Sequence, residues 1–301
     1  MCNYNDMLFY TSITIIYNPI STGPGKRLAE NLATRLKQTT YRAMPKIIAT
    51  THAGHAEELA YELAVASRRP LIIASSGDGG YHEVVNGVMA ARAKGSEAVT
   101  GLLPAGNAND HHRNLHNQPI VQMIEGGEHH LVDLLHLKVT SAAGSWQRYA
   151  HSYAGVGLTP QVGHELNQVQ LNPLNEKWIA LRSFWRLKPV RLIVGGQIDN
   201  YDSLIVSNVP QMSKVLGLSK DAKLNDGKFE ITRVPHKSKL ELLGHLFKAA
   251  TAGLEGSEHA DQFAFQAVEP MMIQLDGEVK SLAANSRVEI SLQPRALECV
   301  T

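Results

Sequence analysis

In the first third of the chain, short apolar runs typical of strands alternate with segments whose apolar residues recur at helical spacing. Short β-branched and aromatic runs predict strands at residues 8–17, 46–50, 71–76 and 99–103. Apolar residues at helical spacing predict helices at residues 27–38 and 55–67, and residues 71–89 read as a short buried strand, a glycine-dense turn and an amphipathic helix. Strands that alternate with helices predict a parallel sheet covered by helices on both faces.

From about residue 131 the pattern changes to short strands with close turns between them. Strands are predicted at residues 131–140, 147–154, 190–194, 203–208, 228–233, 271–275 and 287–292. Helical interruptions are expected at residues 175–187 and 238–252. This pattern predicts an antiparallel, sandwich-like domain. We therefore expect two domains, residues 1–130 and 131–301, with a cleft between them; the last residues are free to return to the first domain.

Composition narrows the class of protein. The net charge is +1, from 29 basic and 28 acidic residues, which argues against a dedicated nucleic-acid binder. The two cysteines, Cys2 and Cys299, fit a reducing compartment. No apolar run approaches 18 residues, and the first run ends at Asn18 without a preceding basic segment, so neither a transmembrane segment nor a signal peptide is expected. A cytoplasmic protein is expected, and the sequence leaves a homodimer open.

Polar turns follow each of the predicted parallel strands. They begin at Asn18, Thr50, Ser76 and Pro104. Ligands of open α/β sheets lie beyond the carboxyl ends of the strands, so these four turns are expected to meet at one edge.

The third turn is rich in glycine. Residues 76–79 read Ser-Gly-Asp-Gly, directly before a helix. Glycine lets the backbone approach a ligand, and a helix N-terminus presents free N–H groups to an anion. The turn is neither a Walker A loop nor a Rossmann fingerprint, because no Gly-Lys-Ser/Thr follows and His82 stands where the third glycine would be. By itself it fits a phosphate site or a plain turn, and Asp78 could hold a metal, orient a donor or act as a base.

Three other polar turns are weak signals when taken singly. Residues 104–110 read Pro-Ala-Gly-Asn-Ala-Asn-Asp, in which the amides and the aspartate are helix-capping types. Asp226-Gly227 and residues 276–278, Asp-Gly-Glu, are ordinary turn chemistry.

The motifs become specific in combination. Asn-Pro-Ile-Ser at residues 18–21, Ser-Gly-Asp-Gly at 76–79, His-Glu-Val-Val-Asn-Gly at 82–87 and the three later turns occur in one order. This order resembles the diacylglycerol kinase catalytic-domain family, including bacterial soluble lipid kinases and sphingosine kinases, over about residues 13–292. The resemblance implies a Rossmann-like, NAD kinase-like α/β domain with a parallel sheet, then an antiparallel β-sandwich-like domain, with the active site in the cleft between them.

The resemblance also implies cofactors and site residues. The cofactors are ATP and Mg²⁺. Asp226 would hold magnesium together with the carbonyls of Lys223 and Lys228, and Glu278 would be the general base, with Asp78 as the second candidate for that role. Nucleotide contacts would fall on Asn18, Thr50, Gly77, Asp78, Gly79, Gly80, Glu83 and Asn107.

The chain departs from the common family pattern at several positions. Ser76, Gly80 and His82 replace Gly, Thr and Asn, although sphingosine kinases also carry the serine and the histidine. Gly80 and Asn107 together remove two hydroxyls near the phosphates. Thr159 stands where an amino-alcohol kinase has a carboxylate, which argues against an amino alcohol as acceptor.

The leading hypothesis is a lipid kinase that transfers the γ-phosphate of ATP to a hydroxyl of diacylglycerol or a related lipid. Such an enzyme would be peripheral and would meet its lipid substrate at a membrane surface in transient association. The alternatives are an NAD kinase, and a regulator of the same fold that binds nucleotide or lipid without efficient catalysis.

Two further features carry open interpretations. Residues 177–191 hold five basic and no acidic residues with two tryptophans, and fit either a membrane-surface helix or a helix that packs its apolar stripe on the second domain. The 14 histidines include His52 and His55, but no Cys or acidic residue recurs at zinc spacing. Surface or capping roles are expected for these histidines.

Overall fold

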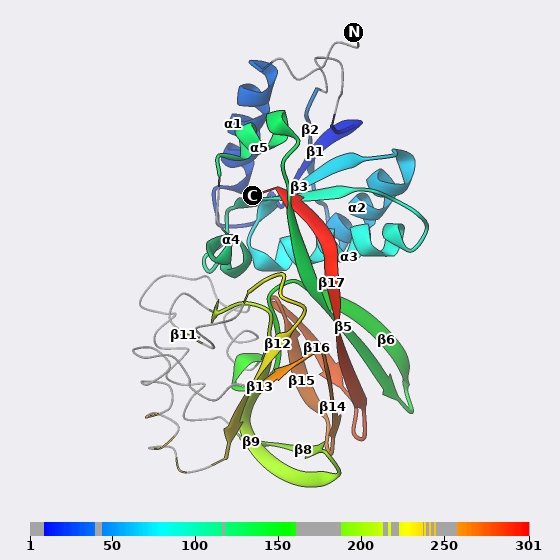
Figure 1. The fold of residues 1–301 in the computed structure, drawn as a ribbon, viewed down its shortest axis with the longest axis vertical. Coiled ribbons are helices and arrows are strands. Elements are labelled where there is room, and N and C mark those ends of the chain that lie inside the picture. Colours follow the sequence, from blue (N-terminus) through cyan, green and yellow to red (C-terminus); the bar gives the residue numbers. More distant parts are fainter. Residues whose placement is uncertain are drawn as a thin grey trace. The chain divides into compact units, whose positions relative to one another are not determined.

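The structure is a computed structural model. It describes residues 9–39, 44–115, 118–160, 188–212, 216–217, 223–236, 238, 241, 244 and 258–300. The chain forms two compact units, Met1–Val132 with Arg295–Thr301, and Asp133–Pro294 (Figure 1).

Unit 1 is built on a parallel sheet, as the alternating pattern predicts. Its strands are β1 (Ser12–Tyr17), β2 (Lys46–Ala49), β3 (Pro70–Ser76), β4 (Val99–Pro104) and the last residues of β17 (Arg287–Val300). Their order is β2-β1-β3-β4-β17, with every neighbouring pair parallel. The central strand β3 is buried at six of its seven residues, which fits a strand covered on both faces.

Helices cover both faces of this sheet (Figure 1). Helices α1 (Gly25–Lys37) and α5 (Ile120–Gly126) pack on one face, where Leu32, Leu36 and Ile124 join a core with Ile15 and Ile73. Helices α2 (His55–Ala66) and α3 (Asp78–Arg92) lie on the other face. The short helix α4 (Asp110–Asn114) follows β4.

The end of β17 is fixed to unit 1 by Glu298. Its Oε2 lies 2.6 Å from Arg69 Nη2 and 3.4 Å from His129 Nε2, and its Oε1 lies 3.4 Å from Arg92 Nη2. The neighbouring Cys299 and Val300 pair with β4 and are fully buried. One carboxylate therefore gathers three basic side chains around the returning strand.

Unit 2 is antiparallel, as the short strands and close turns predict. Its main sheet has the order β16-β15-β7-β9-β8-β14-β17; β12 lies between β9 and β13, and β5 pairs with β6 and β17. The strands are β5 (His130–Ser141), β6 (Gly144–Ala150), β7 (Tyr153–Gly157), β8 (Val190–Val194), β9 (Gln197–Ser207), β10 (Gln211–Met212), β11 (Leu216–Gly217), β12 (Phe229–Pro235), β13 (Glu258–Ala260), β14 (Gln262–Ala267), β15 (Met271–Leu275) and β16 (Glu278–Leu282).

The structure corrects several of the predicted strands of unit 2. The single strand expected at residues 147–154 is two strands, β6 and β7, because the N–H groups of His151 and Ser152 bond to the carboxylate of Asp276. Strand β9 begins six residues before its predicted start. Strands β10, β11, β13, β14 and β16 were not predicted, and β17 runs eight residues past its predicted end at Leu292.

Some expectations fall outside the described residues. The helix expected at residues 175–187 and most of the basic segment 177–191 lie there, as does the helix expected at 238–252 apart from isolated positions. Within the described ranges, no helix is both long enough and apolar enough to cross a membrane.

Candidate functional site

Three loops of unit 1 meet backbone to backbone at the carboxyl ends of β1, β3 and β4. A Cβ added to Gly77 would lie 2.9 Å from Gly106 Cα, and one added to Gly106 would lie 2.4 Å from Gly77 Cα. A Cβ on Gly23 would lie 1.9 Å from the carbonyl oxygen of Ala105, whose own N–H donates to the Ser76 carbonyl at 2.9 Å. These glycines are therefore required by close contact between loops.

A cavity of about 450 Å³ opens beside these loops, wholly within unit 1. This volume falls in the usual range for small-molecule sites. Of the predicted nucleotide contacts, the cavity brings together Asn18, Thr50, Gly80 and Glu83. The described residues that line the cavity do not include the other four predicted contacts, Gly77, Asp78, Gly79 and Asn107.

The first turn of α3 borders the cavity through Gly80. Gly77 occupies the N-cap position and has no side chain with which to cap the helix. The first backbone N–H groups of an α-helix have no partners within the helix and carry the positive end of its dipole. This edge of the cavity is suited to an anion such as phosphate.

Ser76 explains the glycine at position 80. A Cβ on residue 80 would lie 2.7 Å from Ser76 Cβ and 2.8 Å from Ser76 Oγ. The serine side chain thus fills the space that a threonine at position 80 would need. Ser76 also lines the cavity, and its hydroxyl donates to the Gly77 carbonyl at 3.0 Å. The two departures from the family pattern are one coupled change, in which a hydroxyl is lost at position 80 and gained at position 76.

Asp78 links the two glycine loops. Its Oδ1 accepts the backbone N–H of His111 at 3.3 Å, at the start of α4. Burial lowers the pKa of the neighbouring His112 below its usual value, and the charge of Asp78 opposes that shift. An aspartate between the loops is therefore engaged with the segment that follows β4.

Asn109 closes the second glycine loop on itself. It has a φ of 52°, its Oδ1 accepts the Gly106 N–H at 2.9 Å, and its Nδ2 donates to the Gly106 carbonyl at 2.8 Å. Asn109 occupies the N-cap position of α4, as its residue type suggests, but its side chain binds Gly106 in the preceding loop and does not cap the helix. Asn107 is exposed.

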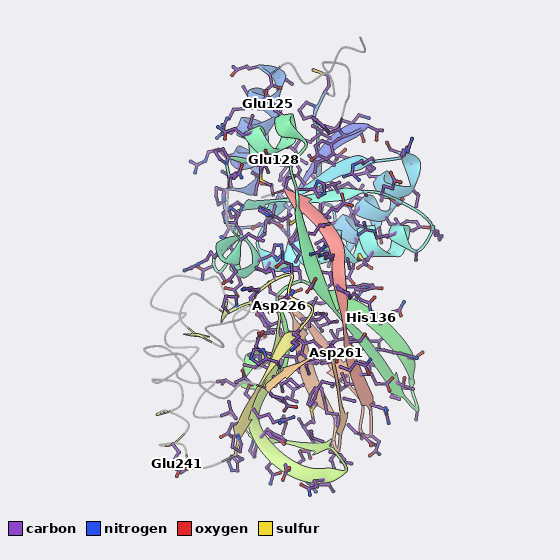
Figure 2. The ribbon with its side chains drawn as sticks, in the orientation of Figure 1. Glu125, Glu128, His136, Asp226, Glu241 and Asp261 are labelled. Atoms are coloured by element: carbon purple, nitrogen blue, oxygen red, sulfur yellow. The ribbon has the colours of Figure 1, made fainter. Side chains whose placement is uncertain are left out.

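In unit 2, the proposed magnesium ligands share one loop. Lys223, Asp226 and Lys228 are exposed on the segment before β12. Figure 2 labels Asp226 on this segment. Asp226 Oδ1 accepts the Lys228 N–H at 3.1 Å, and the carboxylate of Asp133 accepts the Gly227 N–H at 2.8 Å. A carboxylate and backbone carbonyls on a tight turn are oxygen donors of the kind that Mg²⁺ prefers.

The second carboxylate turn is anchored by Asp276. This fully buried side chain accepts the backbone N–H groups of His151, Ser152 and Tyr153 at 2.7, 2.9 and 3.0 Å. Sequence reasoning treated Asp276 only as a turn residue. Its contacts instead fix the hairpin from which Glu278 projects.

Glu278 starts β16 and is 31% exposed. Its carboxylate lies 3.6 Å from Arg148 Nε and 3.0 Å from Lys280 Nζ. Two cations therefore orient the carboxylate proposed as the general base.

Two residues that the sequence reasoning missed connect the turns of Asp226 and Glu278. Asn208 Nδ2 donates to the Asp133 carbonyl at 2.8 Å, and the Asn208 N–H donates to the Ser152 carbonyl at 2.7 Å. Asp133 thus holds Gly227 on one side and, through Asn208 and Ser152, is joined to Asp276 on the other. The sequence feature that could have revealed Asp133 is its place inside the apolar run of residues 131–135.

Glu230 is a third buried carboxylate, and sequence reasoning missed it as well. It is 1% exposed, and neither carboxylate oxygen has a hydrogen-bond partner among the described residues. His259 Nδ1 lies 3.5 Å from Oε1. Burial, with a smaller contribution from the charge of Asp226, raises the pKa of Glu230 to about 7. A glutamate between Phe229 and Ile231 was the signal that could have revealed it.

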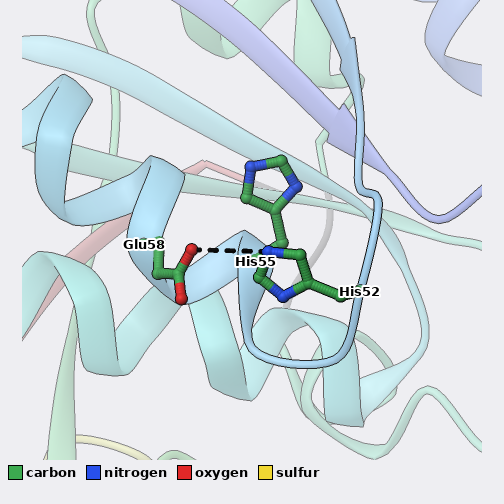
Figure 3. A group of neighbouring side chains, drawn as sticks. All are labelled: His52, His55 and Glu58. Carbon is green, nitrogen blue, oxygen red and sulfur yellow. Dashed lines mark ion pairs between the residues drawn. The ribbon is translucent and has the colours of Figure 1, made fainter.

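His52, His55 and Glu58 gather at the start of α2 (Figure 3). His52 Nε2 lies 3.6 Å from Glu58 Oε2, and the two imidazole rings stack with centroids 4.7 Å apart. However, His55 Nδ1 accepts the Thr51 N–H at 3.0 Å, so the only lone pair of the neutral ring is already used. His55 thus stabilises the loop before α2, and the group lacks the third ligand that a zinc centre needs.

Comparison with known proteins finds the same resemblance. The diacylglycerol kinase catalytic domain matches residues 12–137. The resemblance drawn from the motifs is confirmed. A Staphylococcus epidermidis protein named diacylglycerol kinase is 28% identical over 280 residues, covering 88% of this chain and 84% of its own length. A Staphylococcus aureus protein of the same name is 27% identical, covering 88% and 85%.

A solved structure of a diacylglycerol kinase from Bacillus anthracis has the same fold. It aligns with a TM-score of 0.69 over 96% of each chain, at 17% sequence identity. The expected α/β fold with a parallel sheet, followed by antiparallel strands, is confirmed.

The coupling of Ser76 and Gly80 predicts a non-additive mutant cycle. Gly80→Thr alone should destabilise unit 1 by roughly 1–3 kcal/mol, because the new Cβ overlaps the serine side chain. Ser76→Gly added to Gly80→Thr should recover at least about 1 kcal/mol of that loss. Urea unfolding of the wild type, both single variants and the double variant measures the coupling, and additive free energies within about 0.5 kcal/mol would contradict it.

The raised pKa of Glu230 predicts a pH-dependent stability. The unfolded chain ionises this glutamate near its ordinary pKa of 4.5, whereas the folded chain resists ionisation up to about 7. The wild type should therefore lose on the order of 1–3 kcal/mol relative to Glu230→Gln as the pH rises from 4.5 through 7. Thermal melts without divalent ions test this, with Glu289→Gln, at a 45% exposed side chain, as the control. A wild-type-to-Glu230→Gln difference that stays constant across this pH range would show that the carboxylate titrates normally.

Proposed function

We propose that this chain is a lipid kinase that transfers the γ-phosphate of ATP to a hydroxyl of diacylglycerol or a related lipid, with Mg²⁺ as cofactor. The observation that carries the proposal is the cavity of unit 1, which lies beside the N-terminus of α3 within the segment that matches the diacylglycerol kinase catalytic domain. The names of the staphylococcal relatives support the same reaction class.

The nucleotide is proposed to occupy this cavity. Asn18, Thr50 and Gly80 line it, and Gly80 belongs to the first turn of α3, where the phosphates are proposed to bind. The backbone N–H groups at the start of α3 would bind phosphate oxygens, and Ser76 offers a hydroxyl at the same edge. Backbone donors held by the glycine contacts are already oriented, which is the main protein contribution to phosphoryl transfer.

Unit 2 is proposed to supply the charged groups. Asp226 and the carbonyls of Lys223 and Lys228 would hold Mg²⁺, which neutralises phosphate charge when bound. Glu278 would accept the proton of the attacking hydroxyl. Its carboxylate is suited to this task because Arg148 and Lys280 hold its orientation.

The acceptor is proposed to be a neutral lipid alcohol. Thr159 packs against Gly155. A Cβ added to Gly155 would lie 2.5 Å from the hydroxyl oxygen of Thr159. That hydroxyl is buried without a hydrogen-bond partner among the described residues, so it offers no charge to an ammonium group. A neutral glycerolipid fits this environment better than an amino alcohol. The enzyme would reach such a substrate as a peripheral protein that associates transiently with a membrane surface.

Glu278→Gln is expected to lose phosphoryl transfer while it keeps nucleotide binding. Loss of a general base should lower kcat by about 10²- to 10⁴-fold, because the amide cannot accept the hydroxyl proton. Radiolabelled ATP with diacylglycerol in mixed micelles measures transfer, and calorimetric titration measures ATP affinity. Glu289→Gln, on an exposed surface pair with Arg287, is the matched control.

The same experiment separates the alternatives. Wild-type protein that phosphorylates NAD but no lipid alcohol would identify an NAD kinase. ATP binding without turnover, unchanged by Glu278→Gln, would identify a regulator. Transfer by Glu278→Gln at more than half the wild-type rate would remove Glu278 from the mechanism.

A further inference from the structure

Glu83 lies in the second turn of α3, and its carboxylate points to another helix. Its Oε1 accepts the Gly54 N–H and its Oε2 accepts the Ala56 N–H, each at 3.2 Å. Both amides belong to the start of α2. Gly54 occupies the N-cap position of α2 with a φ of 84° and has no side chain to satisfy these donors. Glu83 therefore caps α2 from outside and places a negative charge at the positive end of its dipole.

Gly87 lies one helical turn beyond Glu83 on the same face of α3. A Cβ on Gly87 would lie 2.3 Å from the Glu57 carbonyl oxygen and 2.9 Å from Ala60 Cβ. The glycine thus lets the backbones of α2 and α3 approach closely. Within the motif of residues 82–87, Glu83 and Gly87 both contact α2, and Glu83 also lines the cavity.

The segment held by Glu83 is one wall of the cavity. Thr50, Thr51, His52, Ala53 and Ala56 all line it. The start of this wall is fixed by the Thr50 N–H, which donates to the Tyr17 carbonyl at 2.9 Å. Its end is fixed by the two bonds to Glu83.

The charge of Glu83 also argues for an indirect role. An ionised carboxylate that faced a nucleotide directly would repel its phosphates. Here both oxygens are occupied by backbone N–H groups at a helix start, so the negative charge is offset within the protein.

We propose that Glu83 is a positioning residue, which holds the wall formed by residues 50–56 in place for the nucleotide and does not itself bind the nucleotide. The inference rests on the proposed function, in which the cavity of unit 1 holds ATP. It assigns the family-like His-Glu-Val-Val-Asn-Gly segment a role in shaping the nucleotide pocket.

Amide hydrogen exchange tests the positioning itself, whether or not the protein is active. In Glu83→Ala, the Gly54 and Ala56 amides should exchange about tenfold or more faster than in the wild type, because their acceptors are removed. The Thr50 amide, bonded to Tyr17, should keep its protection and serves as the internal control. Unchanged exchange at Gly54 and Ala56 would overturn the inference.

Steady-state kinetics test the consequence for the nucleotide. Glu83→Ala should raise KM for ATP about tenfold or more and change kcat less than about threefold, because the wall moves while the reacting groups stay in place. Glu83→Gln keeps one acceptor oxygen and should fall between the wild type and Glu83→Ala in both exchange and KM. Glu62→Gln, at an exposed position of α2, should match the wild type.

The outcomes separate this inference from the proposed function. A fall in kcat at unchanged KM would place Glu83 in the chemistry and overturn the inference, as would faster exchange with an unchanged KM. Wild-type protein without any phosphoryl transfer would end the proposed function, whereas the exchange data would still decide whether Glu83 holds the wall. If Glu83→Ala does not fold, Glu83→Gln supplies both measurements.

Discussion

Contact between the backbones of Gly77 and Gly106 is the constraint on which the candidate site depends. The paired strands β3 and β4 bring these loops together, and the two glycines let the loop backbones touch. Asp78 can then bond to the His111 amide, and the first turn of α3 is left open at the edge of the cavity. A methyl group at either glycine would have to displace backbone, which cannot yield as a side-chain tip can. The site is shaped by absent side chains as much as by present ones.

In unit 2 the loops are positioned by side chains and not by their absence. Buried carboxylates of Asp276 and Asp133 accept backbone N–H groups from distant segments and so fix the turns that present Glu278 and Asp226. Hydrogen bonds to charged groups contribute roughly 1.5–3 kcal/mol each, about twice the value for neutral pairs. Glu230 differs from them, because it is buried without hydrogen-bond partners among the described residues and its pKa is raised. The unit thus bonds two buried carboxylates to backbone N–H groups and leaves a third without such bonds among the described residues.

Periodicity alone predicted most of unit 1, because each element buries one regular face. Local periodicity is sufficient in this unit. It places Leu32 and Leu36 on the buried face of α1 and indicates the continuous burial of β3. In unit 2 the same reasoning failed where distant contacts decide. The break after β6 depends on Asp276, which is more than 120 residues away in sequence. No local pattern could reveal it.

The sequence also carried site information that could be interpreted only in three dimensions. Ser76 and Gly80 read as two separate departures from the family pattern, because the sequence does not show that residue 80 points its Cβ at Ser76. The bond from Glu83 to α2 spans 29 residues, so the sequence could not show that this predicted nucleotide contact also holds another helix. The reaction class came from the resemblance, since apolar periodicity specifies a sheet and helices but no substrate.

Binding of Mg-ATP to the wild type and to Gly106→Ala, measured by isothermal titration calorimetry, tests the central claim most directly. Gly126→Ala is the control, because its new Cβ would lie 3.5 Å from Glu128 Cγ, an ordinary contact distance. The account predicts that the wild type and Gly126→Ala bind Mg-ATP equally, whereas Gly106→Ala binds about tenfold or more weakly as the loops separate. Equal affinity in all three proteins, or no binding by the wild type, would contradict the claim that the glycine contact shapes a nucleotide site.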